Sequence, residues 1–240
     1  MKRLLLGPHA VLEALRAAPD RIAVIYTADE ADAELARLAR ERHIRCERRE
    51  RTELDALAQG VRHQGVLAVA GDYGYVSLDD VLAHAGAPPL LVALDQITDP
   101  HNFGAIVRSA VAFGADGVLT LKDRAAPVTP VVVRASAGAT ERARIARVTN
   151  LARTLNELSD DGLQVVGLDA GGDCDLRELA YGERGRVLVV GSEGHGLRRL
   201  VREHCDVVAA IPLQGPLGSL NASVAAGIAI YESARARARR

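Results

Sequence analysis

The sequence predicts an α/β protein with a small amino-terminal α/β domain, a linker, and a larger carboxyl-terminal domain built on a mostly parallel sheet. Its 240 residues are enough for one large or two small domains. Hydrophobic residues make up 48% of the chain and charged residues 25%, which is typical of a globular protein with a substantial core. From residue 90 onward short apolar segments alternate with helical ones, and this pattern indicates parallel strands covered by helices on both faces.

The first 71 residues are expected to form the small domain. Residues 31–42 are predicted to be helical because Leu35, Leu38 and Ala39 fall on one helix face. Residues 44–48 alternate between apolar and polar side chains, as a half-buried strand does. The other elements expected here are a short helix after Pro8, a strand over 22–27, a short helix over 53–58 and a strand over 65–70.

A change of composition over residues 72–89 predicts a linker. Ser77 and Asp80 have the spacing of a capping box, which indicates a short helix inside the linker. The run Gly-Ala-Pro-Pro at residues 86–89 is typical of a break between domains. We therefore expect one domain over residues 1–71 and a second over residues 90–240.

The second domain is expected to alternate strands and helices. Its predicted strands are short and rich in leucine or β-branched residues, and they cover residues 90–95, 117–121, 164–169, 186–191 and 207–212. Its predicted helices cover residues 103–114, 130–139, 150–161, 197–203 and 219–237. In open α/β sheets ligands bind outside the carboxyl ends of the strands, so the loops after these strands are the places to search for a site.

Charge and composition exclude several classes of protein. The chain has 30 basic and 31 acidic side chains, so it lacks the global positive field that gathers nucleic acid indiscriminately. No apolar run approaches the ~18 residues needed to cross a bilayer, and we expect no membrane partner. Apart from Lys2 and Lys122 every basic residue is arginine, whose planar fork suits phosphate groups, although coding bias in an alanine-rich chain would produce the same excess.

The cysteines and the first residues indicate a reducing compartment. Cys46, Cys174 and Cys205 are far apart and no Cys-x-x-Cys spacing occurs, which argues against a disulfide framework and against a zinc site or other metal site. The first apolar run is only three leucines long and ends at Gly7-Pro8, unlike a signal peptide. We expect a cytoplasmic protein.

Three loops after predicted strands carry polar residues among glycines. In the first, residues 94–108, Asn102 stands where a helix cap would stand and Gly104 leaves room for a ligand or another backbone. Arg108 lies in a stretch of apolar and small residues, where a buried guanidinium would need an anionic partner or a substrate phosphate. A simple cap and a structural ion pair are the alternatives for these two residues.

The second loop, residues 190–197, has three glycines that favour positive φ or close approach to a ligand, and Glu193 is placed to pair with an arginine or to accept a hydroxyl proton. A solvated turn is the alternative. In the third loop, residues 211–223, Ser219 and Asn221 open the final helix, either as caps or aimed at a ligand. None of the loops is a G-x-G-x-x-G or a phosphate-binding G-x-x-x-x-G-K-[ST], which disfavours a dinucleotide site.

Together the loops resemble a known family. They read Asn102-x-Gly104-x-x-x-Arg108, then Gly191-x-Glu193-x-x-Gly196, then Ile211-Pro212 with Ser219-Leu220-Asn221-x-Ser223. In this order they resemble the three motifs of the SpoU (TrmH) family of RNA 2′-O-ribose methyltransferases, over residues 90–237. The run Gly-Pro-His-Ala-Val-Leu-Glu-Ala-Leu at residues 7–15 and Gln-Gly-Val at 64–66 are similar to the RNA-binding domain of the family's RlmB-like branch.

The resemblance implies a SPOUT-type catalytic domain with a deep trefoil knot, S-adenosylmethionine bound in the knot loops, and an active site completed across a homodimer. The backbone around Gly191, Ile211 and Leu220 would hold the adenosine end of the cofactor. Arg108 would polarise the 2′-hydroxyl or fix the adjacent phosphate, because an arginine stays protonated and cannot act as a simple base. Glu193 would orient that guanidinium, and the ribose and loops would be held by Asn102, Ser219 and Asn221.

The RlmB-like domain implies a guanosine of 23S rRNA in the peptidyl-transferase region as substrate, modified during ribosome maturation. Another RNA, such as a tRNA guanosine, and a catalytically silent RNA-binding assembly factor are the alternatives. A dense group of arginines in the first domain could contact the RNA, or could be a solvated helix face interspersed with glutamates. These are Arg37, Arg40, Arg42, Arg45, Arg48, Arg49 and Arg51.

Overall fold

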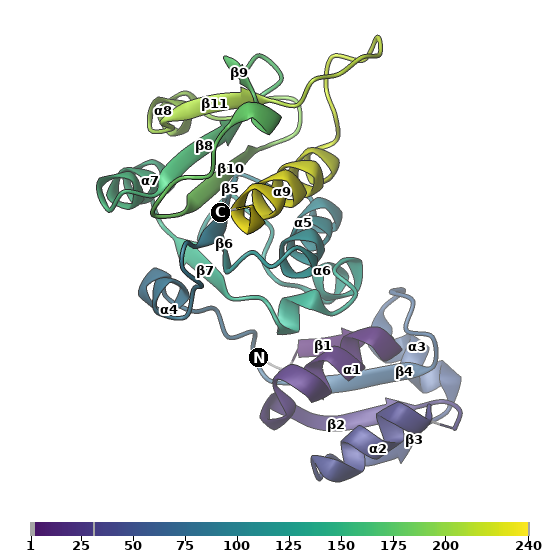
Figure 1. Cartoon of the computed structure of the whole chain (residues 1–240). Helices are drawn as coiled ribbons and strands as arrows, with labels where there is room; N and C mark the ends of the chain where they lie inside the picture. The colour runs from purple at the N-terminus through teal and green to yellow at the C-terminus, as the bar shows by residue number, and fades with distance from the viewer. Residues whose placement is uncertain (1–2, 31, 240) are drawn as a thin grey trace. The chain divides into compact units, whose positions relative to one another are not determined.

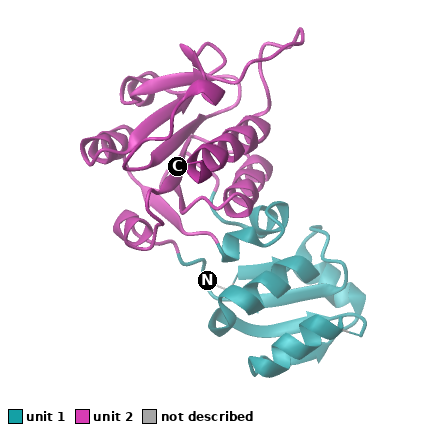
Figure 2. Cartoon of the chain, viewed as in Figure 1, with its two compact units in different colours: residues 1–74, 127–142 teal, residues 75–126, 143–240 magenta. Residues whose placement is uncertain are grey.

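The computed structural model describes residues 3–30 and 32–239, and its chain divides into two compact units. Unit 1 consists of residues 1–74 and 127–142, and unit 2 of residues 75–126 and 143–240 (Figure 2). Residue 31, where a helix was predicted to begin, lies outside the described residues.

Unit 1 contains a four-stranded sheet in the order β1-β4-β2-β3, in which β4 is antiparallel to β1 and β2, and β3 is parallel to β2 (Figure 1). The strands are β1 (Arg3–Leu6), β2 (Ile22–Thr27), β3 (Cys46–Arg48) and β4 (Val66–Ala70). The helical elements are α1 (Pro8–Ala17), η1 (Pro19–Arg21), α2 (Ala33–Glu41), α3 (Arg51–Ala58), α6 (Pro130–Ala135) and η2 (Ala139–Glu141).

Local sequence explains these elements. Asp32 caps α2 by accepting a hydrogen bond from the backbone N–H of Glu34 at 2.9 Å, and the predicted apolar face of the helix is buried. The segment 127–142 is held within unit 1 by Arg3, whose buried guanidinium donates two hydrogen bonds to the Glu141 carboxylate at 2.7 and 2.8 Å. A buried charge of this kind persists because it is paired in a bidentate geometry.

Unit 2 contains a seven-stranded sheet in the order β7-β6-β5-β10-β8-β11-β9, and all its pairings are parallel. The prediction of an α/β fold with a parallel sheet in this part of the chain is confirmed. The strands are β5 (Leu90–Asp95), β6 (Gly117–Leu121), β7 (Ile145–Val148), β8 (Gln164–Leu168), β9 (Cys174–Asp175), β10 (Arg186–Gly191) and β11 (Val207–Ala210). The helical elements are α4 (Leu78–Ala83), α5 (Pro100–Ala112), α7 (Leu151–Asp160), η3 (Leu176–Glu178), α8 (Arg199–Glu203) and α9 (Ala222–Ala238).

The strand order places distant parts of the sequence together. Every residue of β5 and of β10 is buried, and β10 pairs with β5 on one side and with β8 on the other. Because the strands are parallel, the loops that follow β5, β8, β10 and β11 emerge at the same edge of the sheet. On one face of this sheet α5 packs beside α9 (Figure 1).

The N-cap residues show that α5 and α9 begin at positions other than those predicted. Asp99, not Asn102, caps α5, since its carboxylate accepts hydrogen bonds from the backbone N–H groups of His101 and Asn102 at 3.1 and 3.3 Å. The helix therefore begins at Pro100, and Asn102 lies inside its first turn with its side chain free for other contacts. At α9 the cap is Asn221, so Ser219 lies in the preceding loop and not in the helix.

Within residues 3–30 and 32–239, no helix is both long enough and apolar enough to cross a membrane. The same described residues contain no cluster of three or more side chains suited to a metal ion.

Candidate functional site

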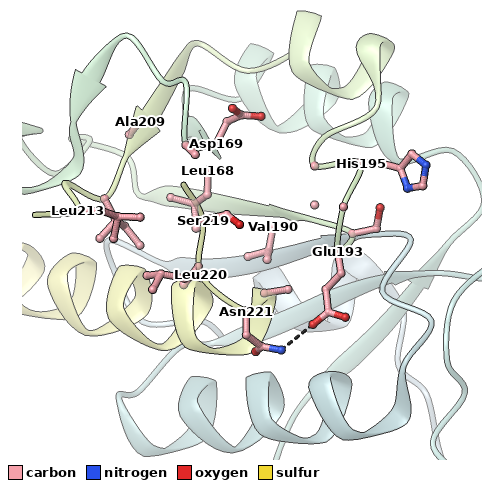
Figure 3. Close-up of a pocket in the computed structure, with 18 residues that line it drawn as sticks. Leu168, Asp169, Val190, Glu193, His195, Ala209, Leu213, Ser219, Leu220 and Asn221 are labelled. Atoms are coloured by element: carbon pink, nitrogen blue, oxygen red, sulfur yellow. Dashed lines mark hydrogen bonds between the residues drawn. The ribbon is translucent and has the colours of Figure 1, made fainter. Parts of the chain in front are cut away.

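A cavity of about 560 Å³ opens at the carboxyl ends of β8, β10 and β11 (Figure 3). Its walls come from the ends of these strands, from the loop after β10, and from the loop that leads into the first turns of α9. The lining residues include all three predicted cofactor residues and three of the five predicted catalytic ones: Gly191, Ile211, Leu220, Glu193, Ser219 and Asn221. Ser219 is exposed on the loop, while Ile211 and Leu220 are half-buried.

The loop after β10 folds back on itself and forms one wall of the cavity. Ser192 and Gly196 exchange two backbone hydrogen bonds, with N···O distances of 3.1 and 2.9 Å. A Cβ atom on Gly191 would lie 2.2 Å from the carbonyl carbon of Gly196, so only glycine fits there. Gly194 and Gly196 have φ of 78° and 62°, the left-handed conformation that the glycine-rich sequence predicts.

Three polar side chains from three separate segments meet beside this wall: the first turn of α5, the loop after β10 and the N-cap of α9. The amide nitrogens of Asn102 and Asn221 both donate to Glu193 Oε1, each at 2.6 Å. The Asn221 amide also lies 3.1 Å from Asn102 Oδ1 (Figure 3 shows Asn221 and Glu193 pointing toward one another). We call Asn102, Glu193 and Asn221 the polar triad. Its members are 119 residues apart at the extremes, and the sheet order alone brings them together.

Arg108 does not join the polar triad within one chain. The expectation that its guanidinium is buried is wrong, because α5 turns Ile106, Val107 and Ala110 into the core and leaves Arg108 exposed. In the part of the chain that the structure describes, Arg108 makes no salt bridge, and Glu193 Oε1 accepts from the two amides instead of from this arginine. The catalytic role expected for Arg108 stays a prediction.

Asp169 is a cavity residue that the sequence analysis missed. It follows β8, its Oδ1 accepts a hydrogen bond from the backbone N–H of Gly171 at 2.9 Å, and its Oδ2 lies 3.2 Å from Arg202 Nη1. The signal was available, since residues 164–169 were predicted as a strand and a carboxylate at the end of a parallel strand faces the ligand edge. His195 was interpreted as an ordinary exposed loop residue, and it too lines the cavity.

The chemistry of the lining favours a ligand without phosphate groups. Among the described residues no lysine or arginine lines the cavity, whereas Asp169 and Glu193 contribute carboxylates and Leu168, Leu213 and Leu220 contribute apolar surface. The volume falls within the range of ~300–1,000 Å³ that is usual for small-molecule sites. A nucleoside whose hydroxyls donate to carboxylates and whose base packs on apolar side chains fits these walls.

The arginine group of unit 1 divides into two sets. Arg37 pairs with Glu41 and Arg45 with Glu47, both at 2.7 Å, and Arg49 lies over the Tyr26 ring while pairing with Glu47 at 3.1 Å. The other members are exposed and make no salt bridge within the described residues. They are Arg40, Arg42, Arg48 and Arg51.

Comparison with known proteins matches both parts of the chain. Residues 89–231 match the model of the SpoU rRNA Methylase family, and residues 4–76 match a model described as RNA 2′-O ribose methyltransferase substrate binding. A protein of Mycolicibacterium smegmatis named as an uncharacterized tRNA/rRNA methyltransferase is 51% identical over 242 residues, which cover 98% of this chain and 76% of the relative.

Solved structures agree with these matches. The SpoU methyltransferase AviRb from Streptomyces viridochromogenes, solved in complex with the cofactor AdoMet, superposes with a TM-score of 0.82 at 27% identity, over 100% of this chain and 92% of that one. An AdoMet-bound rRNA methyltransferase from Sinorhizobium meliloti superposes with a TM-score of 0.81 at 27% identity, over 98% of this chain and 87% of that one.

Proposed function

Because the chain belongs to the SpoU family of RNA methyltransferases, whose cofactor is S-adenosylmethionine, we propose that it methylates the ribose 2′-hydroxyl of a guanosine in 23S rRNA. The observation that carries the proposal is that the polar triad lies beside a cavity without lysine or arginine among its described lining residues, at one edge of the sheet. The proposed target lies in the peptidyl-transferase region, and the modification takes place in the cytoplasm during ribosome maturation.

The residues around the cavity fit S-adenosylmethionine. The backbone near Gly191, Ile211 and Leu220 would hold its adenosine end, and Asp169 would accept hydrogen bonds from its ribose hydroxyls. When bound there, the cofactor supplies a methyl group on a positively charged sulfur. The protein's own task is then to hold the RNA hydroxyl in line and to make it a better nucleophile.

The polar triad and Ser219 would position the ribose and the loops around it. Glu193 Oε1 fixes both amides, which leaves the second carboxylate oxygen available to accept a hydrogen bond. Arg108 would polarise the 2′-hydroxyl or bind the adjacent phosphate. Its guanidinium stays protonated, so it acts by charge and hydrogen bonding and not as a base.

We propose that the active site is completed in a homodimer, in which Arg108 of one copy acts on the ribose bound at the cavity of the other copy. Its exposure and its lack of an ion pair within the described chain support this placement. Val224, Ile228 and Tyr231 are 49%, 37% and 50% exposed at helical spacing on α9, and Phe113 packs on Tyr231 with ring centroids 5.4 Å apart. Exposed apolar faces of this kind are typical of protein interfaces.

The proposal keeps the functional division predicted from the sequence: an RNA-binding domain over residues 1–71, a linker over 72–89 and a catalytic domain over 90–240. The compact units divide the chain differently, since unit 1 also contains residues 127–142 and unit 2 begins at residue 75. The family match of residues 4–76 supports the RNA-binding role. It also keeps the deep trefoil knot, which the resemblance to SpoU methyltransferases supports. Chain connections in proteins almost never thread through loops, so the knot is proposed on the family resemblance alone.

The test is methyl transfer from labelled S-adenosylmethionine to undermethylated 23S rRNA or to bulk tRNA, with the product mapped by resistance to alkaline cleavage. We expect label in 23S rRNA at one guanosine, and loss of at least about 100-fold in rate for a folded Arg108→Ala variant. Label in tRNA alone would favour methylation of a tRNA guanosine instead, an activity within the range of the Mycolicibacterium smegmatis relative, which is named as a tRNA/rRNA methyltransferase. If neither RNA is labelled, the methyltransferase proposal is wrong and the alternative of a catalytically silent RNA-binding assembly factor remains.

A further inference from the structure

A second cavity, of about 460 Å³, adjoins the first in unit 2. Ser192, Glu193 and His195 line both cavities, so the loop after β10 is their common wall. The rest of the second cavity comes from the loop after β5, from the start of α5 and from the loop after β6. These residues are Gln96, Ile97, Thr98, Asp99, Asn102 and Arg124.

Two of its residues adopt a backbone conformation that side chains other than glycine rarely take. Gln96 and Arg124 both have φ of 58°, in the left-handed region. Such positions cost about 1–3 kcal/mol and cluster at binding and catalytic sites. The surrounding structure holds them: the backbone N–H of Ala126 donates to Ile97 O at 2.9 Å, and Asp95, just before Gln96, is buried against Arg198 at 2.6 Å.

The charges of the second cavity differ from those of the first. Arg124 is exposed, and it makes no salt bridge within the described residues. The carboxylates that line the same cavity form no ion pair with Arg124 within the described residues. Asp99 accepts from backbone N–H groups at the start of α5, and Glu193 Oε1 accepts from the amides of Asn102 and Asn221. The guanidinium of Arg124 is therefore available to an anion, and its planar fork matches a phosphodiester.

We propose that the second cavity receives the target nucleotide, that Arg124 binds a phosphate next to the target ribose, and that Gln96 contacts the edge of the base. This inference rests on the proposed function and assigns residues to its RNA side. A nucleotide held there would present its ribose to the common wall, with the cofactor cavity on the other side. The Gln96 amide both donates and accepts, as recognition of a base edge requires.

The test compares Arg124→Ala with Arg153→Ala in the full-length protein. Arg153 is a matched control, because it lies on α7, its side chain is 79% exposed and, among the described residues, its one ion pair is with Glu157. We expect Arg124→Ala to raise the KM for RNA roughly tenfold, to lower the salt dependence of RNA binding by about one phosphate contact, and to leave the Kd for S-adenosylmethionine unchanged. Arg124→Lys should recover part of the loss, since it restores the charge without the fork.

Gln96→Gly tests the base contact, because glycine accepts the left-handed backbone and removes only the amide side chain. We expect this variant to discriminate less between RNAs that differ only in the target base. If the wild type methylates RNA while Arg124→Ala behaves like Arg153→Ala, the nucleotide assignment is wrong and the proposed function stands. If the wild type transfers no methyl group to either RNA, both are overturned.

Discussion

Replacement of Gly191 by alanine is the most direct test of the cavity wall. The added Cβ would lie 2.2 Å from the carbonyl carbon of Gly196, 2.4 Å from its oxygen and 2.5 Å from the backbone nitrogen of Leu197, whereas ordinary contact begins at 3.4 Å. All three atoms belong to the backbone, so no side-chain rotation relieves the clash. The loop must move away by roughly 1 Å, which opens the bridge between Ser192 and Gly196.

The size of the effect follows from that bridge. Two backbone hydrogen bonds at about 0.5–1.5 kcal/mol each put the cost of opening the loop at about 1–3 kcal/mol. For a chain of this size the Tm should fall by roughly 2–12 °C. If cofactor binding requires the closed loop, the affinity for S-adenosylmethionine should fall by the same free energy, which is roughly 5- to 150-fold.

Gly215→Ala is the control, because a Cβ at Gly215 meets nothing within 4 Å and the residue lies in the loop before α9, another segment that contributes to the cavity. Thermal unfolding followed by circular dichroism measures the Tm, and isothermal titration calorimetry measures the cofactor Kd. Gly215→Ala should match the wild type in both. A Gly191→Ala protein with wild-type Tm and wild-type affinity would refute the assignment of this loop as a rigid wall of the cofactor site.

Two further predictions concern other parts of the chain. The double variant Arg40→Ala/Arg42→Ala removes unpaired arginines of unit 1 and should weaken RNA binding and flatten its salt dependence by about one to two contacts, whereas Arg37→Ala/Arg45→Ala removes paired ones and should do less. Equal losses in filter binding at several salt concentrations would contradict this division. Burial raises the pKa of the Cys205 thiol from 9.0 to about 12. Between pH 9 and pH 12 the thiol is therefore deprotonated in the unfolded state but still protonated in the folded state. The free energy of unfolding falls as the pH rises through this range. Cys205→Ala should reduce that fall by no more than about 1.4 kcal/mol per pH unit in urea unfolding, and an unchanged slope would show that the thiol does not contribute.

The sequence predicted the central strands of unit 2 and missed its edges. β5, β6 and β10 are buried throughout, and burial on both faces produces the apolar runs that periodicity detects. β7 was missed because the exposed Arg147 interrupts it, and β9 because two residues carry no pattern. The helix predicted over 130–139 ends at Ala135, since Ala137 and Gly138 take the left-handed conformation.

The polar triad could be predicted as a set of residues but not as a contact. Spacing along the chain identifies Asn102, Glu193 and Asn221 as polar side chains in loops after strands. Their meeting depends on β10 lying between β5 and β8, and no local pattern specifies that order. The burial of Arg108 was wrongly inferred because an apolar neighbourhood in sequence surrounds the exposed face of a helix as well as its buried face.

The excess of arginine over lysine acquires different meanings at different places. Arg186 is 1% exposed, and its guanidinium donates to Gln164 Oε1 at 2.9 Å, Ser233 Oγ at 3.1 Å and Ala180 O at 2.6 Å, all neutral acceptors. Burial lowers the pKa of Arg186. A lysine there would have three donors on one atom and could not reach acceptors on opposite sides, so this position requires the guanidinium fork for structure.

Arg108 and Arg124 are the opposite case, since both are exposed and neither makes a salt bridge in the part of the chain that the structure describes. A guanidinium that pairs with no carboxylate among the described residues keeps its capacity to bind a phosphate. Coding bias would explain the number of arginines equally well in both cases. Coding bias would not place Arg186 where all three of its guanidinium nitrogens donate to the protein. Nor would it place Arg124 beside the polar triad, and Arg108 on the helix of Asn102, without a carboxylate partner among the described residues. The proposed RNA contacts therefore rest on these two unpaired guanidinium groups and not on the number of arginines.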